Sequence, residues 1–174
     1  MTENNKGILL PNTDNHNCFA CSSKNVHGLH MEFYVDSDAV CSWVEVPEHL
    51  CSWSNTVHGG IISTILDETM GWAGIYFLKK VALTKKMTVE FRKALFVGEE
   101  LKVEASVVKT MGKREAAIAG KITNGKNELC ADSEGIFTLV SADVARRLNV
   151  LSDEQVQTFF KPLVHFASGR EQGE

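Results

Sequence analysis

Residues 60–78 carry the feature that most limits what this chain can fold into: a long helical pattern with two very different faces. At about 100° per residue, apolar side chains cover about half of the helix circumference. They are Ile61, Ile62, Ile65, Leu66, Met70, Trp72, Ala73, Tyr76 and Phe77. A helix with so wide an apolar face has to be covered on several sides, and a curved sheet can cover it.

The opposite face is a narrow stripe of small residues: Gly60, Ser63, Thr64, Asp67, Gly71 and Gly74. A solvent-facing stripe normally carries Lys and Glu, and each glycine weakens a helix by roughly 1 kcal/mol relative to alanine. We therefore expect a neighbouring group to approach this stripe closely. Asp67 is the carboxylate within it.

Strand patterns lie on both sides of the helix. Apolar and polar residues alternate over 29–35 and 39–46, which predicts a hairpin of half-buried strands. Pro47 ends the second strand, and the loop of roughly a dozen residues after it has the length typical of functional loops. Four further strand patterns follow the helix and are separated by short turns, which predicts an antiparallel meander: 83–95, 99–110, 114–123 and 127–140. The order predicts an α+β fold in which an antiparallel sheet of about six strands wraps one helix.

We expect a single domain with an extension at each end. Residues 1–27 are polar, contain Pro11 and lack a sustained period, which is typical of an arm. Residues 28–141 form the predicted domain. Residues 142–174 form a helical tail, because Ser141 is a good helix cap and helical spacing follows at Val144, Leu148 and Leu151.

Composition excludes several classes of partner. The net charge of the 174 residues is −4, so the whole chain has no general attraction for nucleic acid or an anionic membrane. No window approaches the 18 or so apolar residues that a membrane span needs, and the first 20 residues lack the pattern of a secretory signal. The five cysteines are an odd number, which favours reduced thiols. We expect a cytoplasmic protein with no nucleic-acid or membrane partner.

Several motifs together resemble one family. The helix opens on His58-Gly59-Gly60, Asp67 follows the histidine by nine positions, and Gly71 lies one turn later. The strand pattern LTKKMTVEFRKAL and the segment VGEELKVEA follow. The N-terminal stretch CFACSSKNVHGLHMEFY, a Cys-rich entry followed by a first strand, completes the set of motifs. Over residues 16–141 the chain resembles the hotdog-fold thioesterases, within them the PaaI-like branch that acts on acyl-CoA.

This resemblance implies an active site shared by two subunits, and therefore a dimer or a dimer of dimers. The Gly59 amide would polarise the thioester carbonyl, and Asp67 of the facing subunit would be the base or the nucleophile. Thr84, after the helix, would help to hold the attacking water. Some members carry an Asn six residues before the histidine as a second carbonyl donor; this chain has Ser52 there and Asn55 nearby.

The residue types fit this chemistry. Hydrolysis of a thioester places negative charge on the carbonyl oxygen, and amides at a helix N-terminus are aimed at an anion. Gly59 and Gly60 have no side chain to obstruct that approach. Burial among small and apolar groups raises the pKa of a carboxyl, which would make Asp67 a better base. His58 either contacts the substrate or bonds the loop backbone, and we interpret Glu68 as a surface or interface carboxylate.

Two other groups of residues are candidates for binding. The phosphates of CoA need local cations, for which Lys113 and Arg114 are our choice; the pairs Lys85/Lys86 and Arg92/Lys93 are alternatives. Cys18-x-x-Cys21 with His16 is compatible with half of a zinc site or with a redox pair. No second Cys-x-x-Cys completes the set, although further ligands are available at His27, His30, Cys41 and Cys51. We favour simple packing of the arm and expect no metal or organic cofactor.

The leading hypothesis is an acyl-CoA thioesterase that uses Asp67 and the Gly59 amide. A hotdog dehydratase or hydratase acting on acyl thioesters is a weaker alternative, since those relatives arrange a histidine and a carboxylate differently. A non-catalytic acyl-CoA sensor is a third hypothesis. The sequence leaves the acyl group, the choice between water activation and an anhydride, and dimer versus tetramer open.

Overall fold

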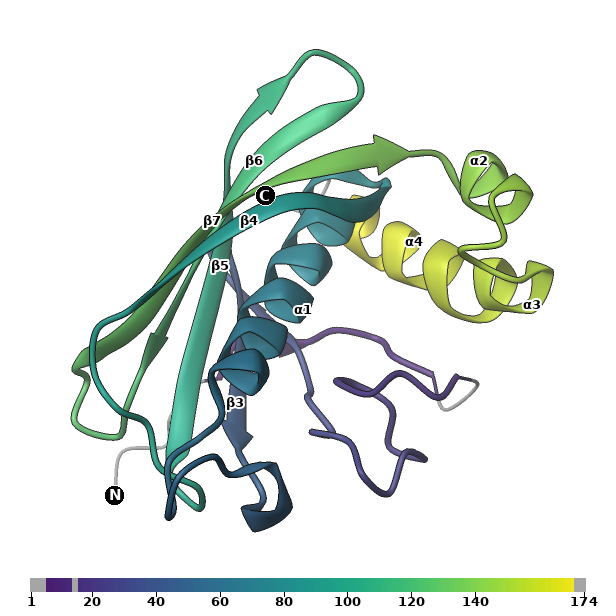
Figure 1. Cartoon of the computed structure of the whole chain (residues 1–174). Coiled ribbons are helices and arrows are strands. Elements are labelled where there is room, and N and C mark those ends of the chain that lie inside the picture. The colour runs from purple at the N-terminus through teal and green to yellow at the C-terminus, as the bar shows by residue number, and fades with distance from the viewer. Residues whose placement is uncertain (1–5, 14–15, 171–174) are drawn as a thin grey trace.

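One long helix lies against the concave face of a single antiparallel sheet (Figure 1). The computed structural model describes residues 6–13 and 16–170. Its sheet contains β1 (Ile8–Leu9), β2 (Tyr34–Asp36), β3 (Ala39–Glu45), β4 (Val81–Phe91), β5 (Glu100–Met111), β6 (Glu115–Thr123) and β7 (Leu129–Val140). The helix is α1 (Gly59–Leu78), preceded by the short 3-10 helix η1 (Glu48–Leu50). The predicted α+β hotdog architecture is confirmed.

The strand order is β1-β2-β3-β5-β6-β7-β4, so the sheet has seven strands instead of about six. The predicted hairpin is confirmed, with Asp36 opposite Ala39. The predicted four-strand meander is wrong in one connection: β5, β6 and β7 follow one another, but β4 pairs with β7, from Val81 opposite Val140. The reason is that α1 crosses the whole sheet and delivers β4 to the far edge (Figure 1).

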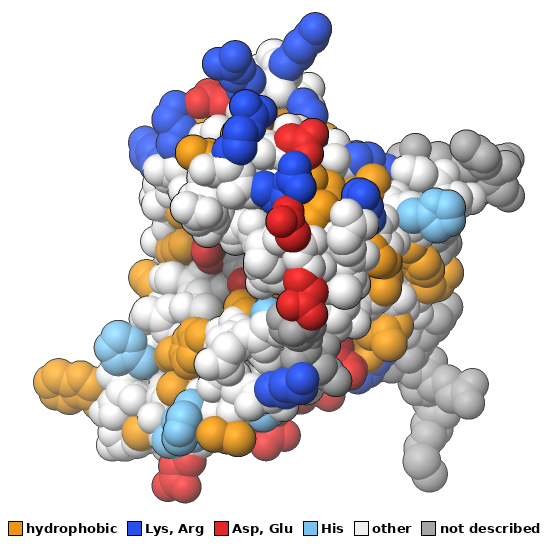
Figure 2. All heavy atoms as spheres, turned by 90° about the vertical axis from the view of Figure 1, so that its right-hand side faces the viewer, with side chains coloured by type: hydrophobic (Ala, Val, Ile, Leu, Met, Phe, Trp, Pro, Cys, Tyr) orange, Lys and Arg blue, Asp and Glu red, His pale blue; other side chains and the backbone are white. Residues whose placement is uncertain are grey.

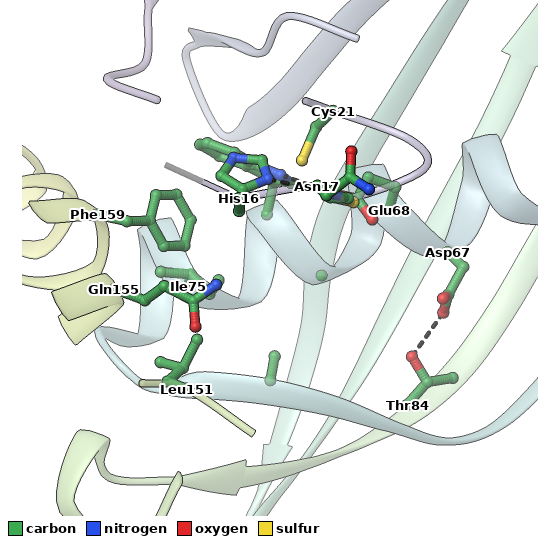
Figure 3. A pocket seen from close by; sticks show the side chains of 14 residues that line it. His16, Asn17, Cys21, Asp67, Glu68, Ile75, Thr84, Leu151, Gln155 and Phe159 are labelled. Atoms are coloured by element: carbon green, nitrogen blue, oxygen red, sulfur yellow. Dashed lines mark hydrogen bonds between the residues drawn. The ribbon is translucent and has the colours of Figure 1, made fainter. Parts of the chain in front are cut away.

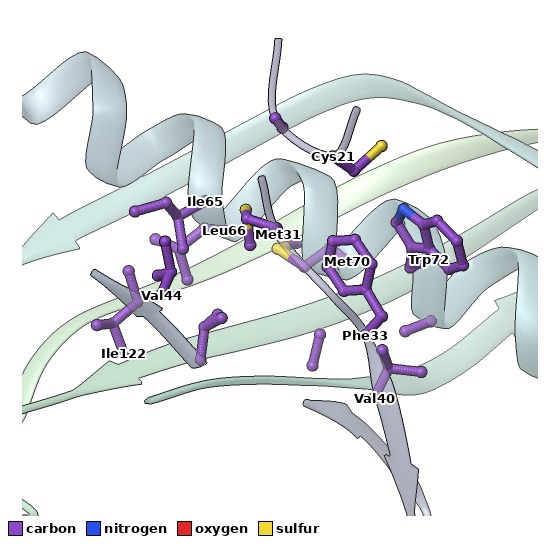
Figure 4. Close-up of a cluster of buried hydrophobic side chains, with 14 of the residues drawn as sticks. Cys21, Met31, Phe33, Val40, Val44, Ile65, Leu66, Met70, Trp72 and Ile122 are labelled. Atoms are coloured by element: carbon purple, nitrogen blue, oxygen red, sulfur yellow. The ribbon is translucent and has the colours of Figure 1, made fainter. Parts of the chain in front are cut away.

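The core lies between α1 and the sheet. Ile65, Leu66 and Met70 of the predicted apolar face are fully buried, and Phe33 stacks on Trp72 at 4.5 Å between ring centroids (Figure 4). The expected close approach to the glycine stripe is found at Gly74, where an added Cβ would lie 2.6 Å from the Cβ of Ala82. A Cβ added at Gly71 would meet nothing within 4 Å, so the stripe is open there.

The segment before β2 departs from a regular strand. Its alternating burial is as predicted, with Leu29, Met31 and Phe33 inside. Its backbone, however, bonds to the arm instead of to a neighbouring strand: the Leu29 amide donates to Phe19 O and the Met31 amide to Ala20 O. Residues 29–33 therefore lie outside the sheet ladder, because the arm occupies that side.

The chain ends in four helical segments, of which the last packs against α1: α2 (Ala142–Arg147), α3 (Asp153–Gln155), the π-helical turn η2 (Val156–Phe160) and α4 (Lys161–Arg170). Ser141 caps α2 as predicted, accepting a hydrogen bond from the Val144 amide. The Phe159 ring lies edge-on to Trp72 at 5.2 Å between centroids, so this region contacts the helix at the same ring as Phe33. No helix in the described ranges is long and apolar enough to cross a membrane.

The predicted arm is partly built into the fold, since β1 pairs with β2. Residues 1–5, 14–15 and 171–174, which belong to the predicted arm and tail, lie outside the described residues. The division into an arm (1–27), a domain (28–141) and a tail (142–174) stays a prediction.

Candidate active site

The start of α1 presents one unused backbone donor. His58 is the N-cap residue, and its Nδ1 accepts a hydrogen bond from the Gly60 amide at 2.9 Å. The amides of Ile61 and Ile62 both donate to His58 O. Among the described residues the Gly59 amide has no acceptor, so it is the first-turn N–H available to an anion. We expected the Gly60 amide to share this role, but it already donates its hydrogen bond to His58 Nδ1.

Asp67 and Thr84 meet between α1 and β4. The Thr84 hydroxyl donates to Asp67 Oδ1 at 2.5 Å, the bond drawn in Figure 3. Asp67 lies in the third turn of α1, and Thr84 in the first half of β4. A hydroxyl that donates to one carboxylate oxygen fixes the orientation of the group and leaves the other oxygen able to accept a proton.

This pair forms one wall of a cavity of about 360 Å³, a volume in the range of small-molecule sites. Its lining comes from α1, β4, the arm and the C-terminal helices (Figure 3): His16, Asn17, Cys18, Cys21, Asp67, Glu68, Gly71, Trp72, Ile75, Ala82, Thr84, Leu151, Gln155 and Phe159. The cavity is therefore apolar along one side and carries acidic groups and thiols along the other.

Within one chain, Gly59 and Asp67 are too far apart to act on the same atom. They are eight positions apart in one helix, and a rise of 1.5 Å per residue separates them by about 12 Å along the axis. The two groups meet at one carbonyl only if they come from different copies of the chain.

Glu68 lies in the same wall but faces the arm. Its Oε1 accepts a hydrogen bond from Trp72 Nε1 at 3.2 Å, and the Cys18 thiol lies 3.7 Å away. Burial raises the pKa of Glu68 to about 7, and the charge of Cys18 adds to this rise. A hydrogen bond from Cys21 lowers the pKa of Cys18 to about 5, while the pKa of Cys21 is raised because it holds the shared proton. Glu68 is thus half-buried in the cavity wall and does not lie on the open surface, while its interpretation as an interface carboxylate stays a prediction.

Ser52 and Asn55 lie in the loop before α1, where the backbone of each forms a hydrogen bond within the protein. The Ser52 amide donates to Thr56 O, and Asn55 O accepts from the Val97 amide. The Asn55 side chain is exposed and that of Ser52 half-buried. Neither lines the cavity around Asp67 within this chain.

The candidate phosphate-binding cations differ in availability. Lys85 pairs with Glu115 at 2.5 Å, Lys93 with Glu128 at 2.7 Å, and Arg92 pairs with Asp132. Within the described part of the chain, Lys113 and Arg114 form no ion pair. Figure 2 shows Lys and Arg side chains gathered at the end of the molecule formed by the β5–β6 turn, which holds both residues.

Sequence reasoning missed the walls that the arm and the C-terminal helices supply. Cys18 and Cys21 were considered for a metal but not connected with Glu68, which is 47 positions beyond Cys21. Phe159 was not considered at all. The Cys-x-x-Cys motif was a usable signal for the cysteine wall of the cavity. The helical spacing in the tail gave no sign that the tail would reach this cavity.

Comparison with known proteins agrees with this architecture. The model of the thioesterase superfamily matches residues 54–131. A protein from Archaeoglobus fulgidus that is named as an esterase is 32% identical over 96 residues, which are 55% of this chain and 60% of that protein. The chain thus matches less than two thirds of the length of this relative.

Two solved structures show the same fold. A thioesterase protein from Streptococcus pneumoniae, solved with coenzyme A, has a TM-score of 0.58 and 17% identity over 64% of this chain and 89% of its own. The same protein has been solved with an aspartate, and separately a threonine, replaced by alanine. The E. coli PaaI protein from the phenylacetic acid degradation operon has a TM-score of 0.57 and 19% identity over 62% of this chain and 82% of its own. The chain therefore has the hotdog fold of these structures, and its residues 54–131 match the model of the thioesterase superfamily.

Proposed function

We propose that the protein hydrolyses acyl-CoA thioesters to a free acid and CoA. The observation that carries the proposal is the Asp67–Thr84 hydrogen bond in the wall of a cavity of ligand size. It couples a carboxylate on the helix to a hydroxyl on the next strand. The pneumococcal protein of the same fold supports this function, because it binds coenzyme A and has been studied through an aspartate and a threonine substitution.

In the proposed reaction, the thioester carbonyl accepts a hydrogen bond from the Gly59 amide of one subunit. Asp67 of the facing subunit accepts a proton from water, whose oxygen attacks the carbonyl carbon. The C–S bond then breaks, and the CoA thiolate takes up the proton. An amide donor of this kind typically contributes about 10²–10³ in kcat, because it stabilises the charge that develops on oxygen.

A shared active site requires an oligomer, and the sheet offers a surface for one. β4 is an edge strand of 11 residues, and its outer side has no partner strand in the described structure. Such an edge favours pairing with another strand. Phe91, at the end of β4, is 56% exposed and lies beside Gly59. We infer a homodimer, or a dimer of dimers, in which these surfaces face each other.

Unpaired cations and free cysteines support the proposed substrate and the proposed cellular compartment of the protein. Lys113 and Arg114 supply positive charge that no described carboxylate neutralises, which fits the phosphates of CoA. All five cysteines are free, which fits a reducing compartment such as the cytoplasm.

The test is thiol release from acetyl-, hexanoyl-, palmitoyl- and phenylacetyl-CoA by the wild type and by Asp67→Asn, with the fold and oligomeric state verified for both. We expect hydrolysis of at least one substrate, and a loss of about 10² or more in kcat/KM in the variant. Binding without thiol release would favour the sensor alternative. Addition of water to an enoyl-CoA without thiol release would favour a hydratase.

A second pair of variants tests the carbonyl donor. Gly59 is the first residue of α1, and His58 before it has φ −64° and ψ 136°. Proline is accepted at a first helical position and prefers such a residue before it, so Gly59→Pro removes the N–H with little strain. Gly59→Ala keeps the N–H, and its methyl group would make only ordinary contact with Phe91, at 3.6 Å. Gly59→Pro should lose about 10²–10³ in kcat, and Gly59→Ala far less.

Isotope labelling distinguishes the two possible roles of Asp67, activation of water and formation of an anhydride. In a single turnover in ¹⁸O-water, activation of water places the label in the released acid. Label in the Asp67 carboxylate would instead show an anhydride whose Asp67 carbonyl is attacked by water. We expect labelled acid and unlabelled protein.

A further inference from the structure

We propose that Cys18, Cys21 and Glu68 bind a divalent cation of the zinc class, which fastens the N-terminal arm to helix α1 beside Asp67. The Sγ atoms of both cysteines and a carboxylate oxygen of Glu68 all lie within 4.8 Å of one another. The three ligands come from two segments that are remote in the sequence, as Figure 3 shows for Cys21 and Glu68. No part of the proposed thioester hydrolysis uses this cluster.

The distance between Cys18 and Glu68 matches a tetrahedral metal site, and the Cys21 sulfur lies within 4.8 Å of both atoms. Zinc bonds of about 2.0–2.3 Å place neighbouring ligand atoms about 3.5–3.8 Å apart. The Cys18 Sγ to Glu68 Oε1 distance is 3.7 Å. Two thiolates and one carboxylate form a donor set that suits zinc better than calcium or magnesium, which prefer oxygen ligands.

The turn that carries the two cysteines is held in place by backbone contacts. The Ser22 amide donates to Cys18 O at 3.2 Å, and the Ser22 hydroxyl to His16 O at 2.6 Å. Asn12 Nδ2 donates to Cys21 O at 3.0 Å. The cysteines are thus presented in a fixed geometry, so little ordering is needed on binding.

Glu68 is held in a matching way. Trp72 Nε1 donates to its Oε1 at 3.2 Å, a contact from the same helix that fixes the orientation of the carboxylate. Metal ligands commonly have such a supporting hydrogen bond. His16 lines the same cavity but is already engaged: Nδ1 accepts from the Cys18 amide, and Nε2 lies 3.1 Å from Asn12 Oδ1. The protein therefore supplies three ligands and leaves the fourth position to water.

The charge of this wall supports a cation. The lining of the cavity includes no Lys or Arg, and no ion pair in the described structure involves Glu68. A half-buried carboxylate is expensive without a counter-charge. A Cys18–Cys21 disulfide would leave Glu68 in the same uncompensated position, whereas a metal ion would be bound by all three groups.

The test is metal binding by untagged, fully reduced protein under anaerobic conditions. Zn²⁺ is measured by elemental analysis after dialysis, and Co²⁺ by its thiolate-to-metal charge-transfer absorption. We expect about one ion per chain. Saturation with Zn²⁺ should also raise the Tm by roughly 5–10 °C, because the metal binds the folded chain.

The variants are Cys18→Ser, Cys21→Ser and Glu68→Gln. Glu68→Gln is nearly isosteric and can still accept the Trp72 hydrogen bond, so it tests the ligand without disturbing the packing. Each should weaken metal binding by at least about 10-fold. Cys51→Ser is the matched control, because Cys51 is half-buried but outside the cluster. It should bind as the wild type does.

Two results would overturn the proposal. One is that the reduced wild type binds no metal, including the case in which Cys18 and Cys21 close to a disulfide on oxidation and act as a redox pair. The other is equal metal binding by the wild type and all three ligand variants. Because each readout is metal binding or stability, the result does not depend on thioester hydrolysis.

Discussion

Two glycines on the same face of α1 should respond in opposite ways to the same substitution. Gly71 and Gly74 both lie in the interior of the helix, and both lose conformational freedom there. Alanine in place of either should favour the helix by about 1 kcal/mol. The surroundings of the new methyl group decide the outcome.

At Gly74 the methyl group has no room. It would lie 2.6 Å from the Cβ of Ala82 and 3.1 Å from Cδ1 of Ile118, and the first of these atoms is attached directly to the backbone of β4. Separating helix and strand costs about 1–3 kcal/mol, as in other overpacked cores. Subtracting the helix gain leaves Gly74→Ala destabilised by about 0–2 kcal/mol.

At Gly71 the methyl group meets nothing within 4 Å and enters the open stripe. Gly71→Ala should therefore be more stable than the wild type by up to about 1 kcal/mol. The difference between the two variants, about 1–3 kcal/mol, is the steric cost alone, since the helix gain is common to both.

Urea unfolding of the wild type and both variants, followed by circular dichroism at equal protein concentration, measures this difference. The same m-value in all three would show that the midpoints report stability. The reasoning fails if Gly74→Ala is as stable as Gly71→Ala, or more stable, since β4 would then not be pressed against α1 at Gly74.

Three further outcomes are expected. Thr84→Val should lower kcat/KM on the order of 10-fold, and Thr84→Ser far less, because only the valine removes the hydroxyl that orients Asp67; equal rates would show that this hydrogen bond has no catalytic role. Ser152→Ala should lower the free energy of unfolding by about 1 kcal/mol in urea melts, since Ser152 and Gln155 form a capping box at α3, and an unchanged midpoint would mean that α3 adds no stability. Burial acts to raise the pKa of Glu104, but Lys102 and Lys121 hold it below its usual value, so its stabilising effect is present above the unfolded pKa and is lost as pH falls through the folded one. Glu104→Gln should therefore be less stable than the wild type at pH 7 and approach it in melts near pH 3, and a difference that does not depend on pH would rule out this charge effect.

Local patterns in the sequence were sufficient for most of the fold. The apolar face of α1 and the alternation in the strands report directly which side of each element is buried. The position of β4 was missed, because short turns favour neighbouring pairing and the sequence gives no sign of which edge a long helix leads to. The arm was underestimated for a related reason: its hydrogen bonds to residues 29–33 join irregular segments, and irregular segments have no period.

The candidate site likewise was predicted where the sequence is periodic and missed where it is not. The small-residue stripe of the helix indicated Asp67, and the resemblance implied that Thr84 acts with it. The grouping of Cys18 and Cys21 with Glu68 could not be predicted, since it depends on how a nonperiodic arm folds back on α1. Asp67 was correctly placed on the helix, and Gly59, expected just before the helix, is its first residue; their separation along α1 shows that one copy cannot bring them together.

The central claim is that Gly59 of one subunit and Asp67 of another act on the same thioester. Gly59→Pro and Asp67→Asn protomers carrying different tags should be expressed together, and the mixed dimers isolated through both tags. Each mixed dimer would contain one intact site and one doubly altered site. We predict about half of the wild-type rate of thiol release from mixed dimers, although each variant alone is nearly inactive. Mixed dimers as inactive as the two parents would contradict the shared site.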